Sequence, residues 1–105
     1  MDLANIAAVL ARDGKRFDGR EMIPAHIARA ARTVMAMCGM YNNSGRYAVR
    51  VGVPSKSGVS GGIMATAPGK MGIGIFSPAL DDFGGSICGI ALMEMLSNRY
   101  GLSVF

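Results

Sequence analysis

Glycine is concentrated in the second half of this chain, and that concentration limits the folds the chain can adopt. Glycine supplies 15 of the 105 residues, about twice the ~7% usual in globular proteins, and ten of the fifteen lie between Gly52 and Gly89. Many of them interrupt apolar runs that otherwise have the composition of β-strands. Glycine weakens a strand unless a close neighbour needs the room. The pattern therefore predicts that another element packs directly onto the backbone of these strands.

The chain is one domain or part of one. It has 105 residues and a mass of 11.0 kDa, whereas independent domains usually have about 100–150 residues. Two domains are therefore excluded. Half of the residues are hydrophobic and only 17% are charged, a composition too apolar for a disordered chain. We treat residues 1–105 as a single segment with a hydrophobic core.

The net charge of +4 comes from the first half of the chain, where eight Lys or Arg residues face four Asp or Glu residues. The basic residues of the segment 12–21 alternate with acidic ones, and no row of aromatic residues lies beside them to stack on bases. This pattern is typical of a solvated surface. We expect no nucleic-acid partner.

Cysteine usage and hydropathy favour a cytoplasmic, soluble protein. Cys38 and Cys88 each lie in an apolar stretch, which favours buried, reduced thiols over a disulfide framework. No apolar run approaches the ~18 residues of a membrane span, and the N-terminus carries Asp2 and no basic and then apolar leader. We expect no membrane association.

Two helices are predicted in the first forty residues. Apolar residues at helical spacing follow Asp2, and Gly14 is a natural end. A charged turn over 15–22 leads to Pro24, a favoured first helical residue, and the second helix is expected to end at Gly39. Its predicted buried face consists of Ile27, Ala30, Ala31, Val34, Met35 and Cys38.

From Tyr47 the apolar residues alternate with a period of two, which is typical of strands. We predict three strands, followed by a closing helix. The first strand is expected over Tyr47–Gly52. The runs Val59–Ala67 and Met71–Phe76 flank Pro68-Gly69-Lys70, a turn suited to an antiparallel hairpin. Ser86 can cap a last helix that Gly101 ends. The order α, α, β, β, β, α predicts an α+β fold with helices on one face of an antiparallel sheet.

Lys56-Ser57-Gly58 forms a K-[ST]-G triplet. In penicillin-recognising serine enzymes this triplet opens the strand that lines the active site, where lysine supplies positive charge, the hydroxyl a hydrogen bond, and glycine room for substrate. The overlapping stretch Gly58–Gly62 fits G-x-S-x-G, but His26 is the only histidine and lies upstream, so a nucleophile elbow is rejected. The His, Cys and carboxylate residues show no metal-ligand spacing.

A longer set of motifs closely resembles the carboxy-terminal part of the glutaminase family, which hydrolyses L-glutamine to L-glutamate and ammonia on a serine β-lactamase-like (penicillin-binding-protein-like) fold. The resemblance covers nearly the whole chain. The motifs are Cys38-Gly39-Met40-Tyr41, Ser44-Gly45, the run from Val51 to Ile63, Pro68-Gly69-Lys70-Met71-Gly72, and Phe76-Ser77-Pro78-Ala79-Leu80-Asp81.

The resemblance implies roles for three residues. Tyr41 matches a tyrosine that contacts bound glutamine near the nucleophile, so its hydroxyl is a candidate proton donor or positioning group for the leaving ammonia. Val59 matches the residue whose main-chain N–H helps to form the oxyanion hole. Lys56, with Ser57, would flank that hole and supply positive potential; a purely scaffolding role for Lys56 is an equal alternative. No metal or organic cofactor is implied.

The chain contains no S-x-x-K, so the family's serine nucleophile and its lysine base belong to sequence outside these residues. We expect the chain to be inactive alone and the complete enzyme to be a homo-oligomer, as the family commonly is. Two other interpretations stay open: a fragment of a penicillin-recognising serine hydrolase, and a non-catalytic oligomerisation or regulatory module.

Overall fold

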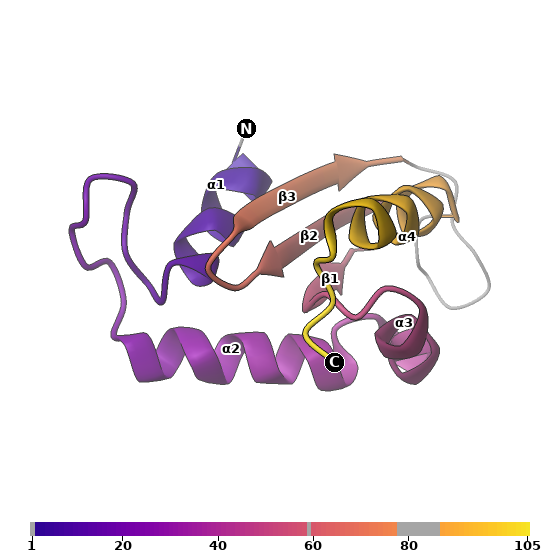
Figure 1. Cartoon of the computed structure of the whole chain (residues 1–105), viewed down its shortest axis with the longest axis horizontal. Coiled ribbons are helices and arrows are strands. Elements are labelled where there is room, and N and C mark those ends of the chain that lie inside the picture. The colour runs from indigo at the N-terminus through magenta and orange to yellow at the C-terminus, as the bar shows by residue number, and fades with distance from the viewer. Residues whose placement is uncertain (1, 59, 78–86) are drawn as a thin grey trace.

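The described part of the chain folds as four α-helices, a short 3₁₀ helix and one three-stranded sheet (Figure 1). The computed structural model describes residues 2–58, 60–77 and 87–105. The elements are α1 (Asp2–Ala11), α2 (Ala25–Cys38), η1 (Tyr41–Asn43), α3 (Ser44–Arg50), β1 (Ser55–Ser57), β2 (Gly62–Ala67), β3 (Met71–Phe76) and α4 (Ile87–Tyr100). The α+β fold predicted from the sequence is confirmed.

Glycine and proline set the helix boundaries as the sequence predicts. Pro24 is the N-cap of α2, and Gly39 is its C-cap. Gly14 and Gly101 adopt positive φ angles of 88° and 61° shortly after α1 and α4. Because such angles cost a side-chain-bearing residue strain, glycine can end both helices here. The proposed Ser86 cap lies outside the described residues.

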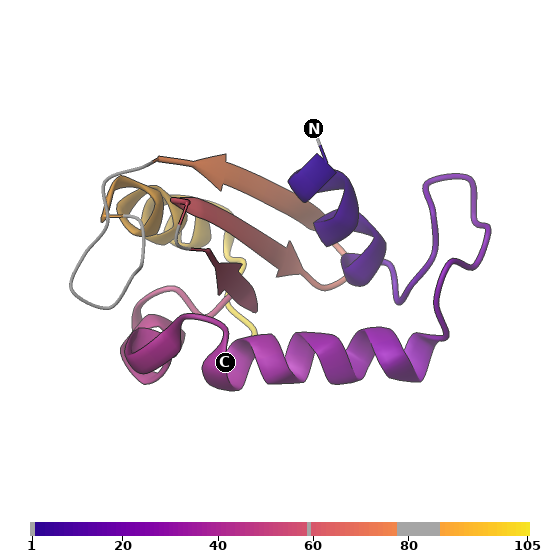
Figure 2. The ribbon, with the colours of Figure 1, turned by 180° about the vertical axis from the view of Figure 1, so that it is seen from behind.

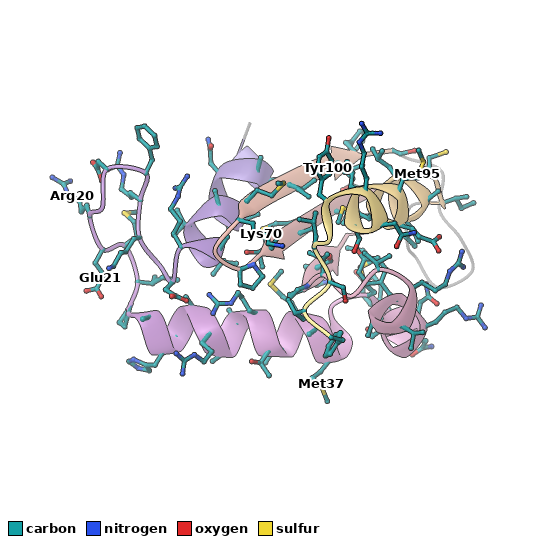
Figure 3. The ribbon with its side chains drawn as sticks, in the orientation of Figure 1. Arg20, Glu21, Met37, Lys70, Met95 and Tyr100 are labelled. Carbon is teal, nitrogen blue, oxygen red and sulfur yellow. The ribbon has the colours of Figure 1, made fainter. Side chains whose placement is uncertain are left out.

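The buried face of α2 differs from the predicted one. Met35 is buried as predicted and Ala28 is buried in addition, whereas Ile27 and Val34 are 47% and 59% exposed. Successive side chains along a helix point about 100° apart. The face of α2 that packs against α1 and the sheet is therefore a different one from the face that carries most of its apolar residues. Met37 points away from the sheet (Figure 3) and is 75% exposed. The most apolar stripe of α2 is therefore uncovered among the described residues.

Both cysteines were also expected to be buried, and this prediction is wrong. Cys38 and Cys88 are exposed and free. Cys38 lies on the uncovered stripe of α2, where its thiol contacts the carbonyl oxygen of Val34. Cys88 is in the first turn of α4, on a side of that helix away from the core. Each cysteine thus lies in an apolar stretch of sequence but is exposed in the fold.

The strand predicted over Tyr47–Gly52 is instead the helix α3 and the turn after it. Tyr47 and Val51, four residues apart, are buried at 4% and 1% exposure, while Val49 between them is 88% exposed. That pattern has the period of a helix and not of a strand. The first strand is β1, Ser55–Ser57, eight residues later than predicted at its start.

The sheet is antiparallel throughout, in the order β1-β2-β3. The predicted hairpin is confirmed: Gly69 takes φ 72° in the turn, and the Lys70 N–H donates to the Ala67 carbonyl oxygen at 2.9 Å. Strand β2 begins at Gly62, because Gly61 lies in a turn in which its N–H donates to Gly58. The run predicted to start at Val59 is therefore shorter.

Helices cover both faces of the sheet, not one (Figures 1 and 2). Ile63, Ala65 and Ala67 point to one face and join Met93 of α4 in the main core. On the other face, a Cβ on Gly72 would overlap backbone atoms of Ala4, Ala7 and Ala8 in α1. The strand glycines thus admit a helix at backbone contact, as the sequence predicts.

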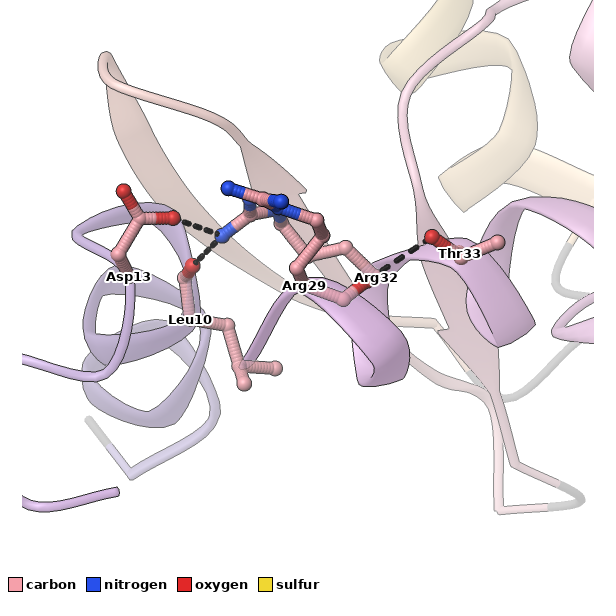
Figure 4. Close-up of polar contacts among 5 residues, drawn as sticks. All are labelled: Leu10, Asp13, Arg29, Arg32 and Thr33. Atoms are coloured by element: carbon pink, nitrogen blue, oxygen red, sulfur yellow. Dashed lines mark hydrogen bonds and ion pairs between the residues drawn. The ribbon is translucent and has the colours of Figure 1, made fainter. Parts of the chain in front are cut away.

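Arg32 ties α2 to the end of α1 (Figure 4). Its guanidinium donates to the carbonyl oxygen of Leu10 at 2.6 Å and to the carboxylate of Asp13 at 2.8 Å. The Arg32 side chain is 13% exposed and that of Asp13 54%. The Leu10 carbonyl oxygen also accepts the Asp13 N–H at 3.3 Å, so Arg32 gives this carbonyl at the helix end a second hydrogen bond and ties α2 to α1.

Candidate active site

A pocket of about 490 Å³ opens at the β1 edge of the sheet. Residues from α1, η1, β1, β2 and the turn between the last two line it: Leu3, Tyr41, Lys56, Ser57, Gly58, Ser60, Gly62 and Met64. Two residues implied by the sequence, Tyr41 and Lys56, are thus brought together although they stand fifteen positions apart.

The approach of the two segments depends on the end of α2. The Ser57 N–H donates to the carbonyl oxygen of Gly39 at 3.1 Å. A Cβ on Gly39 would overlap the Ser55 carbonyl oxygen, so only glycine allows the helix end to lie this close to β1. Because Tyr41 follows two residues later, the same contact carries it to the pocket.

Tyr41 has a strained backbone. Its φ is +56°, and Asp13 is the only other residue with a side chain and positive φ in the described part of the chain. A left-handed conformation costs an L-residue about 1–2 kcal/mol, and an aromatic residue has no local polar group to offset that cost. Strain of this kind clusters at functional sites. The Tyr41 side chain is 42% exposed at the pocket rim.

Lys56 supplies the positive charge of the pocket. Its Nζ lies 4.3 Å from the centroid of the Tyr41 ring, a cation–π contact, and donates to the carbonyl oxygen of Ser57. Lys56 pairs with Met64 across the sheet, so both face the side that α1 covers. The ammonium and the phenol therefore form one wall on which an anion or a polar amide could lie.

Ser57 lies differently from the sequence expectation. Alternation along β1 turns its side chain to the face opposite Lys56, where Ser57 pairs with Ile63. Its hydroxyl is buried and has no hydrogen-bond partner within the described residues. Although Ser57 contributes to the pocket lining, its Oγ is less accessible than a hydroxyl directed at substrate would be. Val59, the predicted oxyanion-hole residue, lies outside the described residues.

Tyr47 anchors β1 from behind, a role that sequence analysis missed because the residue was assigned to a strand. Its hydroxyl is 2.8 Å from the Oγ of Ser55, which in turn lies 2.8 Å from the Val53 carbonyl oxygen. Since that carbonyl can only accept, Ser55 donates to it and Tyr47 donates to Ser55. Burial raises the pKa of Tyr47 to about 12.

Comparison with known proteins decides the family. The glutaminase family model matches residues 1–105. The chain belongs to the glutaminase family. Two similar relatives are the glutaminases of Geobacillus kaustophilus and Clostridium tetani, each 54% identical, over 100% and 99% of this chain. The chain spans only 34% of the length of either relative and corresponds to their C-terminal part.

Solved glutaminases have the same fold over this region. A Bacillus subtilis glutaminase, in covalent complex with 5-oxo-L-norleucine after reaction with 6-diazo-5-oxo-L-norleucine, superposes with a TM-score of 0.95 at 45% identity. The match covers 99% of this chain and 38% of that one. Mglu in its glutamate form gives a TM-score of 0.94 at 41% identity, covering 99% and 24%. The predicted serine β-lactamase-like fold is confirmed.

Two kinds of feature are absent from the described residues. No three His, Cys, Asp or Glu side chains gather closely enough there to hold a metal ion. None of the helices in those residues is long and apolar enough to cross a membrane.

Proposed function

We propose that this chain supplies one wall of a glutaminase active site, for hydrolysis of L-glutamine to L-glutamate and ammonia. The observation that carries the proposal is the contact of Tyr41 with Lys56 at the rim of one pocket, in a member of the glutaminase family. Residues 1–105 form one segment of the catalytic domain in this proposal. The serine nucleophile and its lysine base come from polypeptide outside them.

In the proposed mechanism, the serine hydroxyl attacks the side-chain amide carbon of glutamine and forms an acyl-enzyme. The N–H of Val59 stabilises the oxyanion that develops on the amide oxygen. The Tyr41 hydroxyl donates a proton to the leaving ammonia or positions it. Water then hydrolyses the ester and releases glutamate. The covalent 5-oxo-L-norleucine complex of the Bacillus subtilis relative supports a covalent route, since this compound is a ketone analogue of glutamine.

Lys56 provides positive potential beside the oxyanion and, through its contact with the Tyr41 ring, a fixed surface for the phenol. No metal or organic cofactor takes part in the proposed reaction, because serine chemistry with an oxyanion hole needs none.

The surroundings of the complete enzyme follow from the same proposal. We infer a cytoplasmic homo-oligomer with no nucleic-acid or membrane partner. The uncovered apolar residues of α2 and α4 support association with further polypeptide, since Val34, Met37 and Met95 are each more than half exposed. Met95 projects outward from α4 (Figure 3). Single exposed apolar residues are ordinary, but a row of them along a helix face marks an interface.

A chimera tests the proposal. The matching C-terminal third of the Bacillus subtilis glutaminase that is 51% identical to this chain is replaced by residues 1–105, and ammonia release from glutamine is measured. We expect an active chimera, and a loss of about 10²-fold in kcat for its Tyr41→Phe variant, the size expected for one general acid. The isolated chain should release no ammonia.

The control is Tyr100→Phe, which removes the same hydroxyl from a tyrosine on α4 outside the pocket and should leave the rate unchanged. A chimera that unfolds cooperatively on heating but releases no ammonia contradicts the proposal. Ammonia release by the 105-residue chain alone would contradict the assignment of the nucleophile to another segment.

A further inference from the structure

The connection between α2 and α3 holds Tyr41 in an unfavourable conformation. The backbone there makes two 3₁₀ hydrogen bonds, from the Asn43 N–H to the Met40 carbonyl oxygen and from the Ser44 N–H to the Tyr41 carbonyl oxygen. Tyr41 begins η1 with φ +56°, while Met40 before it is buried at 2% exposure in the main core. A tyrosine at a half-exposed rim gains little from this angle by packing alone. Some neighbouring group must stabilise it.

The hydroxyl of Ser44 is placed to do so. It donates to the Tyr41 carbonyl oxygen at 2.8 Å and accepts the Met40 N–H at 3.0 Å. These two backbone groups lie at opposite ends of the Met40–Tyr41 dipeptide, so one oxygen bridges the peptide pair that contains the strained angle. Ser44 is only 6% exposed, and water does not replace a buried bridge of this kind at low cost.

The bridge connects to the pocket through a second contact. The carbonyl of Gly39, just before the bridged pair, accepts the Ser57 N–H from β1. The segment between α2 and α3 is thus held to β1 on one side and to the first turn of α3 on the other. The Tyr41 ring extends from between these two attachments to Lys56.

We propose that Ser44 is a positioning residue: its hydroxyl bridge sets the left-handed backbone of Tyr41 and so directs the phenol against Lys56. The inference rests on the proposed function only for the catalytic role of the Tyr41 phenol that Ser44 positions. The bridge itself is a property of the 105-residue chain. It can be tested without a nucleophile.

The test is an NMR measurement on the chain with Ser44→Ala. The Lys56 Nζ lies over the Tyr41 ring, 4.3 Å from its centroid, so we expect the ring current to shift the resonances of the neighbouring ε-methylene protons upfield. The Tyr41→Ala variant defines their value without a ring. We expect Ser44→Ala to move the Lys56 resonances most of the way to that value. Its melting temperature should fall as for the loss of any buried hydrogen bond.

Ser97→Ala is the matched control. Ser97 is buried at 4% exposure and its hydroxyl donates to the Val51 carbonyl oxygen, away from the pocket. It should lower the melting temperature by a similar amount and leave the Lys56 resonances at their wild-type positions. The comparison separates a positioning role from a general contribution to stability.

If Ser44→Ala does not fold, the pair Ser44→Thr and Ser44→Val replaces it, since these side chains have nearly the same shape and only threonine keeps the hydroxyl. Wild-type Lys56 shifts in the threonine variant and ring-free shifts in the valine variant support the proposal. Equal shifts in both, or wild-type shifts in a folded Ser44→Ala, overturn it. Each of these results is independent of whether the glutaminase chimera is active.

Discussion

Replacing Gly72 by alanine tests the contact on which the whole arrangement of α1 depends. A Cβ at this position would overlap the Ala8 nitrogen, the Ala7 carbonyl carbon and the Ala4 oxygen. All three atoms belong to the backbone of one helix, so no side-chain rotation can relieve the overlap. The helix must move away from the sheet, and Leu3, which lines the pocket from α1, must move with it.

The magnitude can be estimated from the two opposing effects. Overpacking by one methyl group costs about 1–3 kcal/mol, and the rigid neighbours here put the cost at the upper end, near about 3 kcal/mol. Alanine also restricts the unfolded chain, which returns about 0.4–1 kcal/mol. The net loss in the free energy of unfolding is therefore about 2 kcal/mol. With a urea m-value of about 1.5 kcal/mol/M, the midpoint falls by roughly 1.3 M.

Urea unfolding followed by circular dichroism measures this shift. Gly45→Ala is the matched control, because Gly45 lies exposed in α3 and a Cβ there meets nothing within 4 Å. That variant should gain about 0.5–1 kcal/mol from helix propensity. A Gly72→Ala protein with an unchanged or higher midpoint, beside a stabilised Gly45→Ala protein, would show that α1 does not rest on the backbone of β3.

Two further predictions concern polar contacts outside the pocket lining, one at Tyr47 and one at Arg32. The Tyr47 hydroxyl has a pKa of about 12 in the folded chain and about 10 in the unfolded chain. Because the unfolded chain loses this proton at lower pH, the free energy of unfolding should fall by about 1.4 kcal/mol per pH unit from pH 10 to 12. Tyr47→Phe should lose about 1 kcal/mol at pH 7 and lack its share of that alkaline decline in urea titrations. Arg32→Ala should cost about 1–2 kcal/mol through the carbonyl of Leu10, whereas Asp13→Asn should cost under about 0.5 kcal/mol because its ion pair is exposed; equal losses in thermal melts would refute that division.

Local chemistry made several elements predictable. Pro24 marks the start of α2 because proline fits a helix start. Gly39 marks its end as predicted, although its φ of −66° is helical and glycine is needed there for the contact with Ser55. Pro68-Gly69-Lys70 forms the predicted hairpin because Gly69 can take the positive φ that the turn needs. The segment after Tyr47 was assigned wrongly, since alternating valines fit a strand locally and only burial of Tyr47 with Val51 reveals the helical period.

The candidate site divides in the same way. Tyr41 and Lys56 were named from family resemblance, and their contact is now described. The Gly39–Ser57 hydrogen bond brings their two segments together, and the periodicity of the sequence does not predict that bond. The role of Ser44 could not be predicted from the sequence because its hydroxyl acts on the backbone of Met40 and Tyr41. That of Tyr47 was missed because the residue was assigned to a strand. A serine three residues after Tyr41 was the one available signal for the bridge.

The sequence by itself determined the family, the helix ends, the hairpin and the need for close packing on a glycine-rich sheet, because these depend on residue type and short spacing. Only the tertiary structure decided which faces are covered. It places α1 against Gly72 and Gly74 and α4 on the opposite face, and leaves the most apolar stripe of α2 open. Burial of a side chain depends on which other element packs against it, and the sequence of one helix does not specify that element.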